Sequence, residues 1–558
     1  MRLNKFFREG AGKYVLIGVT AVALVGLIVL NLLLTHIGAN ELLYIDLTEE
    51  GFYTVSDAMV EHTQFINKLE TPNQKVKITF CADPDTLIMT ERVRMPYFLA
   101  LGLQQLYPER IEVETVNVIY NPTAVSKYKA NSLTQIESDD IIFSYGERYR
   151  IIGADNMWIA NSSTGELYSF NGEYKMATAI MSVTAKERPV AYFSIGHGET
   201  YYDTARPDRV ENNDAEALYD LLLDRGLEVK TLDLRTEDIP DDCVLLVINN
   251  PREDFVSGEL SDGNAIGFIS QTEKIDRYLV REQGAVMVSK DPMLELHNFD
   301  LFLYEWGFDI PKAIVEDREY YMSGTEGYNK IIGIYDTDPE SYGMAIYENF
   351  AALPSAPSMI FKNTGFIECA YGQAESVNEP GTVTVNRHYA PFFYSSTVAN
   401  ALDSANQNYH NAAIQGAMDI AAVTTRKEID QDTAEYKYSY VFCAPSTEAF
   451  SNELLGNGSY ANFDIMASLI QNMSRIDEYA SIELGGTSFN SDNFGGKPLL
   501  NTGMSEEPIF DINDEGEEEM IVEGLTAAKK TVYTILIAIA PVTLAVLGIV
   551  VKVKRKNK

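Results

Sequence analysis

The stretch Val190-Ala-Tyr-Phe-Ser-Ile-Gly-His-Gly-Glu199 joins a short apolar run to a turn that contains two glycines. A continuous apolar run of this length is typical of a strand in a parallel sheet that is covered on both faces. Similar strand patterns alternate with helical patterns further along the chain, which predicts a doubly wound α/β domain. In chain order, the expected segments are a helix at 214–225, strands at 228–233 and 243–249, a helix at 272–282 and a strand at 285–289.

The same sheet is expected to close late in the chain, with a strand at residues 440–444 and a helix near residues 463–476. The larger α/β domain therefore comprises residues 186–311 and 438–490, with a parallel sheet of flavodoxin-like or glutamine-amidotransferase-like type. Residues 312–437 form an insertion rich in Tyr, Gly and Asn, to which the pattern assigns no structure. Residues 491–528 are predicted to be an acidic linker.

A smaller domain is expected in residues 40–155. It begins with a strand at 76–80, a helix at 90–106 and a second strand at 111–119, and it ends with a hairpin at 141–152 that turns at Gly146. This order of strand, helix, strand and hairpin favours a small α/β domain of thioredoxin-like type.

Two long uncharged runs predict membrane anchors. Residues 14–34 and 531–551 are each 21 residues long and carry no charged side chain. As helices they reach about 30 Å, which is the thickness of the hydrocarbon core of a bilayer. No small-residue cleavage site closes the first run, so we expect an anchor that is not removed.

Basic residues outside the two runs set the expected topology. Residues 1–13 carry four basic side chains, and residues 552–558 carry five. Cationic flanks resist translocation, so both termini are predicted to be cytoplasmic and residues 35–528 to lie outside, on a bacterial cell membrane. Lys529 and Lys530 oppose this rule, but they are outnumbered by the five basic residues beyond the span.

The charge balance excludes one class of partner. The chain has 44 basic and 81 acidic residues and a net charge of −37, and the segment between the basic flanks is more negative still. A surface this acidic repels the phosphates of nucleic acid, so DNA or RNA binding is excluded.

The cysteines suggest no redox or zinc chemistry. Cys81, Cys243, Cys369 and Cys443 are widely spaced and form no Cys-x-x-Cys pair. Two of them end apolar runs, so we expect small buried side chains, and no zinc site. For a domain outside the cytoplasm, the sequence does not exclude a disulfide between two of them.

Two motifs carry a resemblance to a known family. Asp46-Leu-Thr-Glu-Glu-Gly-Phe-Tyr-Thr-Val-Ser56, after the first predicted span, resembles the juxtamembrane signature of the gliding-motility-associated GldG-type auxiliary proteins of ABC transport systems. The stretch 190–199 resembles that family's strand and Gly-His-Gly-Glu turn. Looser similarity follows in Lys290-Asp-Pro and in residues 296–308, and it covers most of 40–310 and 438–478. Residues 312–437 show no motif of the family.

The resemblance implies an auxiliary subunit without catalytic residues. Its partners would be an ABC-2-type permease and a separate cytoplasmic ATPase, and no cofactor is implied. The chain itself offers no phosphate-binding loop, because Gly456-Asn-Gly-Ser-Tyr and Gly495-Gly-Lys-Pro both lack the required spacing. Likewise, Asp511 begins a run that resembles a calcium loop, but its twelfth position is Val522 rather than an acid.

His197, Gly198 and Glu199 are the candidate ligand-binding or docking residues. They follow a strand at the edge where open α/β sheets usually bind ligands. A His–Glu pair suits metal binding or acid–base work. Alternatively, the glycines only shape the turn while His197 and Glu199 bond to their neighbours. No nucleophile elbow or His-Glu-x-x-His helix accompanies them, so we predict neither a catalytic residue nor a metal ligand.

The sequence therefore favours a non-enzymatic extracytoplasmic subunit of an ABC-type transport complex. Two other functions stay open. One is a cell-envelope hydrolase of amidotransferase-like fold with His197 and Glu199 in its site. The other is a membrane-anchored protein that binds a sugar or peptide, for instance a cell-envelope ligand.

Overall fold

The computed structural model describes residues 53–474, apart from short gaps, and the segments 510–512 and 518–520. Both predicted spans, their basic flanks and most of the acidic linker lie outside the described residues. Among the helices that are described, none is long and apolar enough to cross a membrane. The gaps fall at residues 57–58, 61–62, 70, 72–73, 130–134, 161–166, 186–187, 204–212, 257–269, 282, 324–326, 339–340, 351–356, 379–384, 404–413, 430–435 and 458–459.

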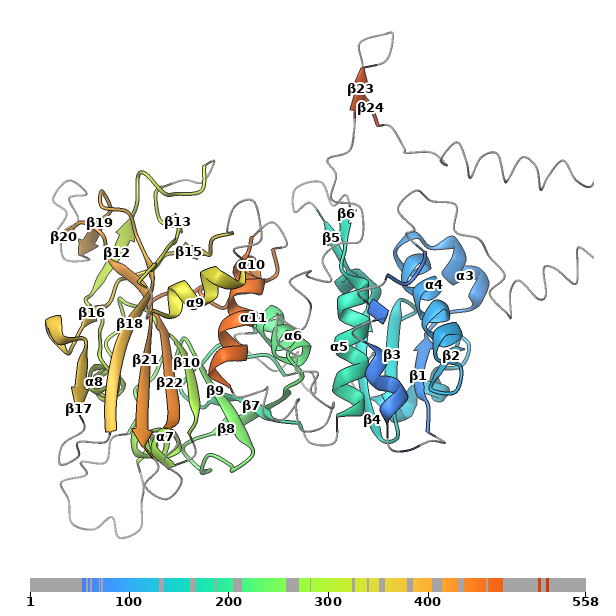
Figure 1. Ribbon diagram of the computed structural model, residues 1–558, viewed down its shortest axis with the longest axis horizontal. Helices are drawn as coiled ribbons and strands as arrows, with labels where there is room; N and C mark the ends of the chain where they lie inside the picture. The colour runs from blue at the N-terminus through green and yellow to red at the C-terminus, as the bar shows by residue number, and fades with distance from the viewer. Residues whose placement is uncertain are drawn as a thin grey trace, which may run out of the picture.

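The chain folds as a mixed α/β protein with parallel and antiparallel strand pairs (Figure 1). A four-stranded sheet lies in the N-terminal part, and a nine-stranded sheet lies in the part that follows it. Four smaller sheets have two strands each: β5 (Trp158–Ala160) with β6 (Leu167–Phe170), β11 (Phe308–Asp309) with β16 (Glu368–Cys369), β13 (Lys330–Ile332) with β15 (Ile360–Lys362), and β23 (Phe510–Ile512) with β24 (Glu518–Met520). A further sheet has three strands, in the order β12 (Ala313–Glu316), β19 (Asn400–Asp403) and β20 (Ile414–Gln415). Short 3₁₀ turns are η1 (Gln64–Lys68), η2 (Pro122–Tyr128), η3 (Ala154–Met157) and η5 (Gly372–Ala374).

The four-stranded sheet has the order β2-β1-β3-β4, in which β1 and β2 are parallel and the other pairs are antiparallel. The predicted first strand, helix and hairpin are confirmed, and Gly146 makes the hairpin turn with a φ of +64°. The second strand is shorter than expected because the Asn117 side chain accepts the amide hydrogens of Ile119 and Tyr120 and so starts a turn. The elements are β1 (Val76–Phe80), α3 (Pro84–Met89), α4 (Glu91–Leu106), β2 (Ile111–Thr115), β3 (Asp140–Tyr145) and β4 (Arg148–Gly153).

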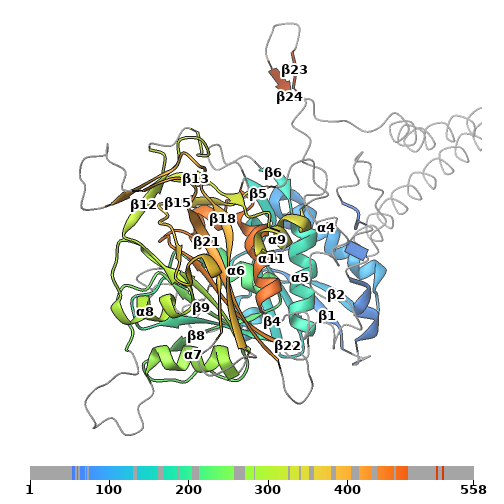
Figure 2. The same cartoon turned by 60° about the vertical axis from the view of Figure 1, so that its left-hand side comes forward.

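Helix α5 (Gly172–Thr184), which the sequence pattern did not single out, lies between the two large sheets (Figures 1 and 2). Every residue of α5 except Tyr174 is buried. The helix packs on β3 and β4 on one side and on α6 (Glu216–Asp224) on the other. It is therefore covered by both parts of the protein.

A buried charge cluster joins the same two parts. Lys175 on α5 and Arg150 on β4 both bind the carboxylate of Asp224 at the end of α6, and the Lys175 Nζ to Asp224 Oδ2 distance is 2.6 Å. Burial alone would raise the pKa of Asp224, but the two cations outweigh it and hold that pKa below its usual value. The aspartate is thus ionised and paired on both sides.

The nine-stranded sheet has the order β14-β18-β21-β22-β10-β9-β7-β8, with β17 paired to β18. Its parallel part is β22-β10-β9-β7-β8, and the predicted strands at 228–233, 243–249 and 285–289 are confirmed. The bounds are β7 (Val190–Ile195), β8 (Glu228–Asp233), β9 (Cys243–Asn249), β10 (Ala285–Ser289) and β22 (Tyr436–Ala444), with helices α7 (Gln271–Arg281), α8 (His297–Glu305), α10 (Asn452–Leu455) and α11 (Asn462–Met473).

Alternate residues of the parallel strands enter two separate cores. On β7, Phe193 packs with α6 and α11 on one face, whereas Tyr192 packs with α7 and α8 on the other (Figure 2). The sheet is therefore covered by helices on both faces.

Residues 312–437, to which the sequence pattern assigned no structure, extend this sheet by antiparallel strands. The long strand β21 pairs with β22, and β18 pairs with β21. The added elements are β14 (Ile334–Tyr335), α9 (Tyr342–Asn349), β17 (Ser376–Asn378), β18 (Val385–Tyr394) and β21 (Asp419–Ile429).

Candidate functional site

The candidate turn lies at the carboxyl end of β7, where both glycines adopt a left-handed backbone. The φ angles are +108° at Gly196 and +74° at Gly198, a region that side chains disfavour. Space is also limiting, because a Cβ on Gly196 would lie 2.6 Å from Nε of Arg235. A Cβ on Gly198 would lie 2.9 Å from Cβ of Arg252. The glycines therefore allow two arginine side chains to lie directly against the turn.

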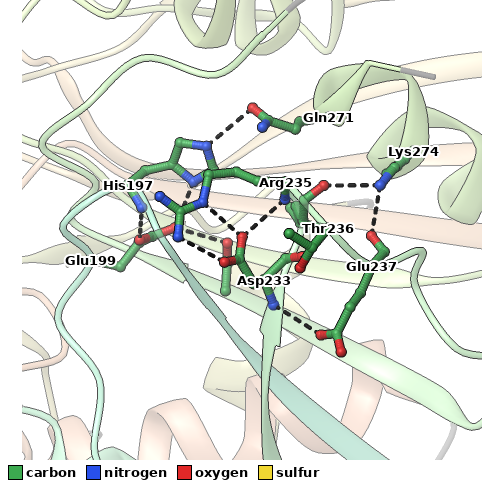
Figure 3. Close-up of polar contacts among 10 residues, drawn as sticks. His197, Glu199, Asp233, Arg235, Thr236, Glu237, Gln271 and Lys274 are labelled. Atoms are coloured by element: carbon green, nitrogen blue, oxygen red, sulfur yellow. Dashed lines mark hydrogen bonds and ion pairs between the residues drawn. The ribbon is translucent and has the colours of Figure 1, made fainter. Parts of the chain in front are cut away.

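The buried side chain of His197 is contacted at one face of its ring and at both ring nitrogens. Its side chain is only 3% exposed, and its ring stacks on Phe255 at a centroid distance of 4.0 Å. Nδ1 lies 3.2 Å from Oε1 of Glu199, and Nε2 lies 3.0 Å from Oε1 of Gln271, the first residue of α7 (Figure 3). The imidazole thus connects the end of β7 to the start of α7.

The partners of His197 determine which of its nitrogens carry hydrogen. Oε1 of Gln271 also accepts the backbone N–H of Val256, so it faces His197 as an acceptor. The Glu199 carboxylate accepts the hydroxyl of Ser194 and the backbone N–H of His197 as well. Both ring nitrogens therefore face oxygen atoms of neighbouring side chains.

Glu199 is a buried carboxylate that accepts several hydrogen bonds. Burial raises its pKa, but the hydrogen bonds from His197 and from the backbone outweigh burial, and the pKa lies below its usual value of 4.5. Because both ring nitrogens of His197 already lie within hydrogen-bond distance of Glu199 and Gln271, the pair presents no free nitrogen to a metal or a substrate. Across the described residues, no group of three or more His, Cys, Asp or Glu side chains is placed to hold a metal ion.

Two exposed arginines border the turn. Arg235 is half exposed and donates two hydrogen bonds to Asp233, at 2.9 and 2.7 Å (Figure 3). Arg252 is also half exposed and lies 3.6 Å from Asp291. The hydrogen bond from Arg235 holds the pKa of Asp233 below its usual value. The rim of the turn therefore presents two guanidinium groups to solvent, each paired with an aspartate, and such a surface is suited to docking.

Asn250 adds an unusual feature at the end of the neighbouring strand β9. It is 2% exposed, its φ of +54° is left-handed, and its Oδ1 has no hydrogen-bond partner among the described residues. Asparagine adopts this left-handed conformation more readily than most residues, so the buried Oδ1 is the notable feature of Asn250. Sequence reasoning missed Asn250, Arg235, Arg252 and Gln271, because they lie in the loop after β8, in the loop after β9 and at the start of α7, which only the fold brings to one edge.

The cysteines lie in the core rather than at a site. All four are free thiols; Cys81, Cys243 and Cys443 are buried, and Cys369 is partly exposed. Burial raises the pKa of each of the three buried thiols to about 12. The prediction of small buried side chains is confirmed for these three, which are unsuited to act as nucleophiles.

Comparisons with known proteins add no relative. No protein-family model, curated protein or solved structure matches the chain. The resemblance to GldG-type proteins therefore rests on the sequence motifs quoted above.

Proposed function

We propose that the protein is a non-enzymatic extracytoplasmic auxiliary subunit of an ABC-type transport complex. Its partners would be an ABC-2-type permease in the membrane and a separate cytoplasmic ATPase. The two motifs in order between two predicted spans support this role. In this proposal both termini are cytoplasmic, and the described residues lie outside the cell membrane.

One contact carries the proposal furthest. Ser56 ends the juxtamembrane motif, and it donates two hydrogen bonds to the buried carboxylate of Glu173, from its N–H at 2.8 Å and from its hydroxyl at 2.6 Å. Glu173 lies in the first turn of α5, the helix that is packed between both sheets. The last residue of the juxtamembrane motif is therefore tied to the centre of the protein.

The residues just before Ser56 are also docked. Tyr53 packs edge-on against Phe98 of α4, with ring centroids 5.5 Å apart. Val55 fills the space beside Gly102 of the same helix, where a Cβ would come within 2.8 Å of it. Residues 53–56 are therefore packed against α4 and α5.

The finer fold assignments belong to the same proposal. The order β2-β1-β3-β4, with one parallel pair and a hairpin, is the arrangement expected of a thioredoxin-like domain. In chain order, the parallel strands of the larger sheet read 2-1-3-4-5, the flavodoxin-like order of a doubly wound fold. Both folds serve enzymes and binding modules alike, so the fold alone selects neither.

The Gly-His-Gly-Glu turn supports docking rather than catalysis. His197 and Glu199 use their hydrogen-bonding groups on each other and on Ser194 and Gln271. What the turn offers to a partner is its rim, formed by Arg235 and Arg252. We assign the turn the role of shaping that rim.

Co-purification tests the proposed function. The intact protein, tagged and extracted from its own membranes in mild detergent, should bring with it one multi-span permease and one P-loop ATPase in fixed proportion. A Glu173→Leu variant should lose these partners while Ser126→Ala, an exposed serine on η2, keeps them. Recovery of the protein alone, from membranes in which it is abundant, would refute the proposal.

A further inference from the structure

A second feature lies at the same edge of the nine-stranded sheet. A hollow of about 390 Å³ opens where β18 ends and β21 begins. Since β18 runs parallel to β22, its carboxyl end lies at the edge that also carries the His197 turn. Five strand steps separate β18 from β7, or roughly 24 Å at the usual strand spacing. The hollow is therefore a separate place on the protein.

The lining of the hollow is aromatic and polar. Tyr320 and Tyr394 contribute rings, Thr397 contributes a hydroxyl group and Glu319 contributes a carboxylate, whereas the hydroxyl of the buried Ser396 is bonded to Asp317. Tyr320 and Thr397 are exposed, whereas Tyr394 is half-buried. The hollow is open to solvent rather than enclosed.

A buried carboxylate holds the two walls together. Asp317 is fully buried and accepts four hydrogen bonds, from N and Oγ of Ser396 at 2.7 and 2.8 Å and from N of Glu319 and Tyr320 at 2.9 and 3.0 Å. Burying a charge is costly unless such bonds compensate. Asp317 therefore fixes residues 319–320 beside residues 395–397, and the hollow is formed before any ligand arrives.

The back of the hollow is fixed by strand pairing. Ile334 of β14 pairs with Tyr394 at the end of β18, and the backbone of Ser395 bonds to Met418 just before β21. Ser395 Oγ also accepts the N–H of Met418 at 3.0 Å. Tyr394 is therefore held in position by the sheet, while Tyr320 stands opposite on a loop held by Asp317.

The charge around the hollow selects against anions. Burial and the nearby carboxylates of Asp336 and Asp419 raise the pKa of Tyr394. Burial also raises the pKa of Asp419 to about 6, so this carboxyl is largely ionised at neutral pH. No lysine or arginine lines the hollow as described. A ligand with phosphate, sulfate or carboxylate groups would be repelled.

We propose that this hollow binds an uncharged saccharide unit. A tyrosine ring packs against the apolar C–H face of a sugar, and its hydroxyl adds a polar contact. Hydroxyl and carboxylate side chains both accept hydrogen bonds from sugar hydroxyl groups. The proposal stands apart from the transport role, because the lining and the charge of the hollow carry it alone.

Titration calorimetry on the intact protein tests the proposal. The protein is kept in a zwitterionic detergent, since a detergent with a sugar headgroup would compete. The probes are short oligomers of glucose, galactose, mannose and N-acetylglucosamine, and galacturonate oligomers serve as the anionic match. At least one neutral series should bind, and the galacturonate series should bind at least about tenfold more weakly.

Variants place the binding at the hollow. Tyr320→Ala removes an exposed ring and should weaken binding about tenfold or more, the loss of one aromatic contact. Tyr394→Phe keeps the ring but removes its hydroxyl and should weaken binding less. Tyr120→Ala, which removes an even more exposed ring from the part of the protein that carries the four-stranded sheet, should change nothing. No binding by any neutral series, preference for galacturonate, or binding untouched by Tyr320→Ala would each overturn the proposal.

Discussion

Nε2 of His197 lies 3.0 Å from Oε1 of Gln271, an oxygen that is already bonded to the backbone N–H of Val256. This relationship joins the carboxyl end of β7 to the first residue of α7 and orients the ring toward Glu199. It makes His197 part of the framework of the turn.

His197→Ala should destabilise the protein by about 1–3 kcal/mol, because it removes two hydrogen bonds and leaves buried acceptors on Glu199 and Gln271. Urea unfolding of the intact protein measures the loss. His388→Ala is the matched control, since His388 is half-buried and its ring bonds to Ser376 alone among the contacts described. Full stability combined with lost transport, in both His197→Ala and Glu199→Gln, would show instead that the turn is a site.

Glu199 should give stability that depends on pH. Its folded pKa lies below 4.5, so its contribution is present above that value and is lost as the pH falls through the folded pKa. The difference in unfolding free energy between the wild type and Glu199→Gln should therefore shrink between about pH 6 and about pH 3. A difference that stays constant over this range would contradict the assigned ion pair.

Ser56→Ala should weaken the attachment of the juxtamembrane segment by about 1–3 kcal/mol, since a buried carboxylate loses a hydrogen-bond donor. Burial raises the pKa of Glu173, and the bonds from Ser56 oppose that rise only in part. Stability tied to Glu173 is therefore greatest below its ordinary pKa and falls as the pH rises through the folded value. In Ser56→Ala this fall should be larger, whereas Ser126→Ala should behave like the wild type.

Asp224→Asn should cost about 3–5 kcal/mol, because it leaves the Lys175 and Arg150 charges buried without their partner. The two tryptophans of the chain report on the result, since Trp158 packs on Phe170 beside α5 and Trp306 lies in the core under the nine-stranded sheet. Two variants that keep either Trp158 or Trp306 should give unfolding curves that coincide while Asp224 is present. The two curves should separate when Asp224→Asn is added to each variant. Asp233→Asn removes an exposed pair and should cost less than about 1 kcal/mol.

The predicted topology can be tested by labelling in unbroken cells. Thr123→Cys places a thiol on the surface of the four-stranded domain, and Asn557→Cys places one beyond the second predicted span. In a Cys369→Ser background, an impermeant thiol reagent should label position 123 and leave position 557 unlabelled. Labelling at 557 would place the C-terminus outside.

Much of the sheet could be predicted because its parallel strands are buried on both faces. Residues 243–249 and 285–289 are apolar except for the last residue of each, and the structure places strands at the same bounds. Strand β22 begins at Tyr436, four residues earlier than predicted. The prediction started too late because the first half of this strand alternates tyrosines with polar residues. β18 and β21 escaped prediction for the same reason, since His388, Arg387 and Lys427 interrupt their apolar pattern.

Helix α5 shows a different limit. Apart from Glu173 and Lys175 in its first turn, most of its residues are apolar or small on every side, so it lacks the single apolar stripe that reveals a surface helix. The site shows a third limit. The motif itself located His197 and Glu199, but Gln271 and Arg235 reach them only through the register of β7 with its neighbours. Residues that lie this far apart in the sequence cannot be recognised as partners of His197 and Glu199 from the sequence alone.

The position of α5 has a consequence for how the protein can be divided. Because each domain uses this helix to complete its core, a fragment cut on either side of residues 172–184 exposes an apolar surface. The two domains therefore cannot be exchanged as independent modules between related chains. A change that loosens one of them also removes a wall from the other.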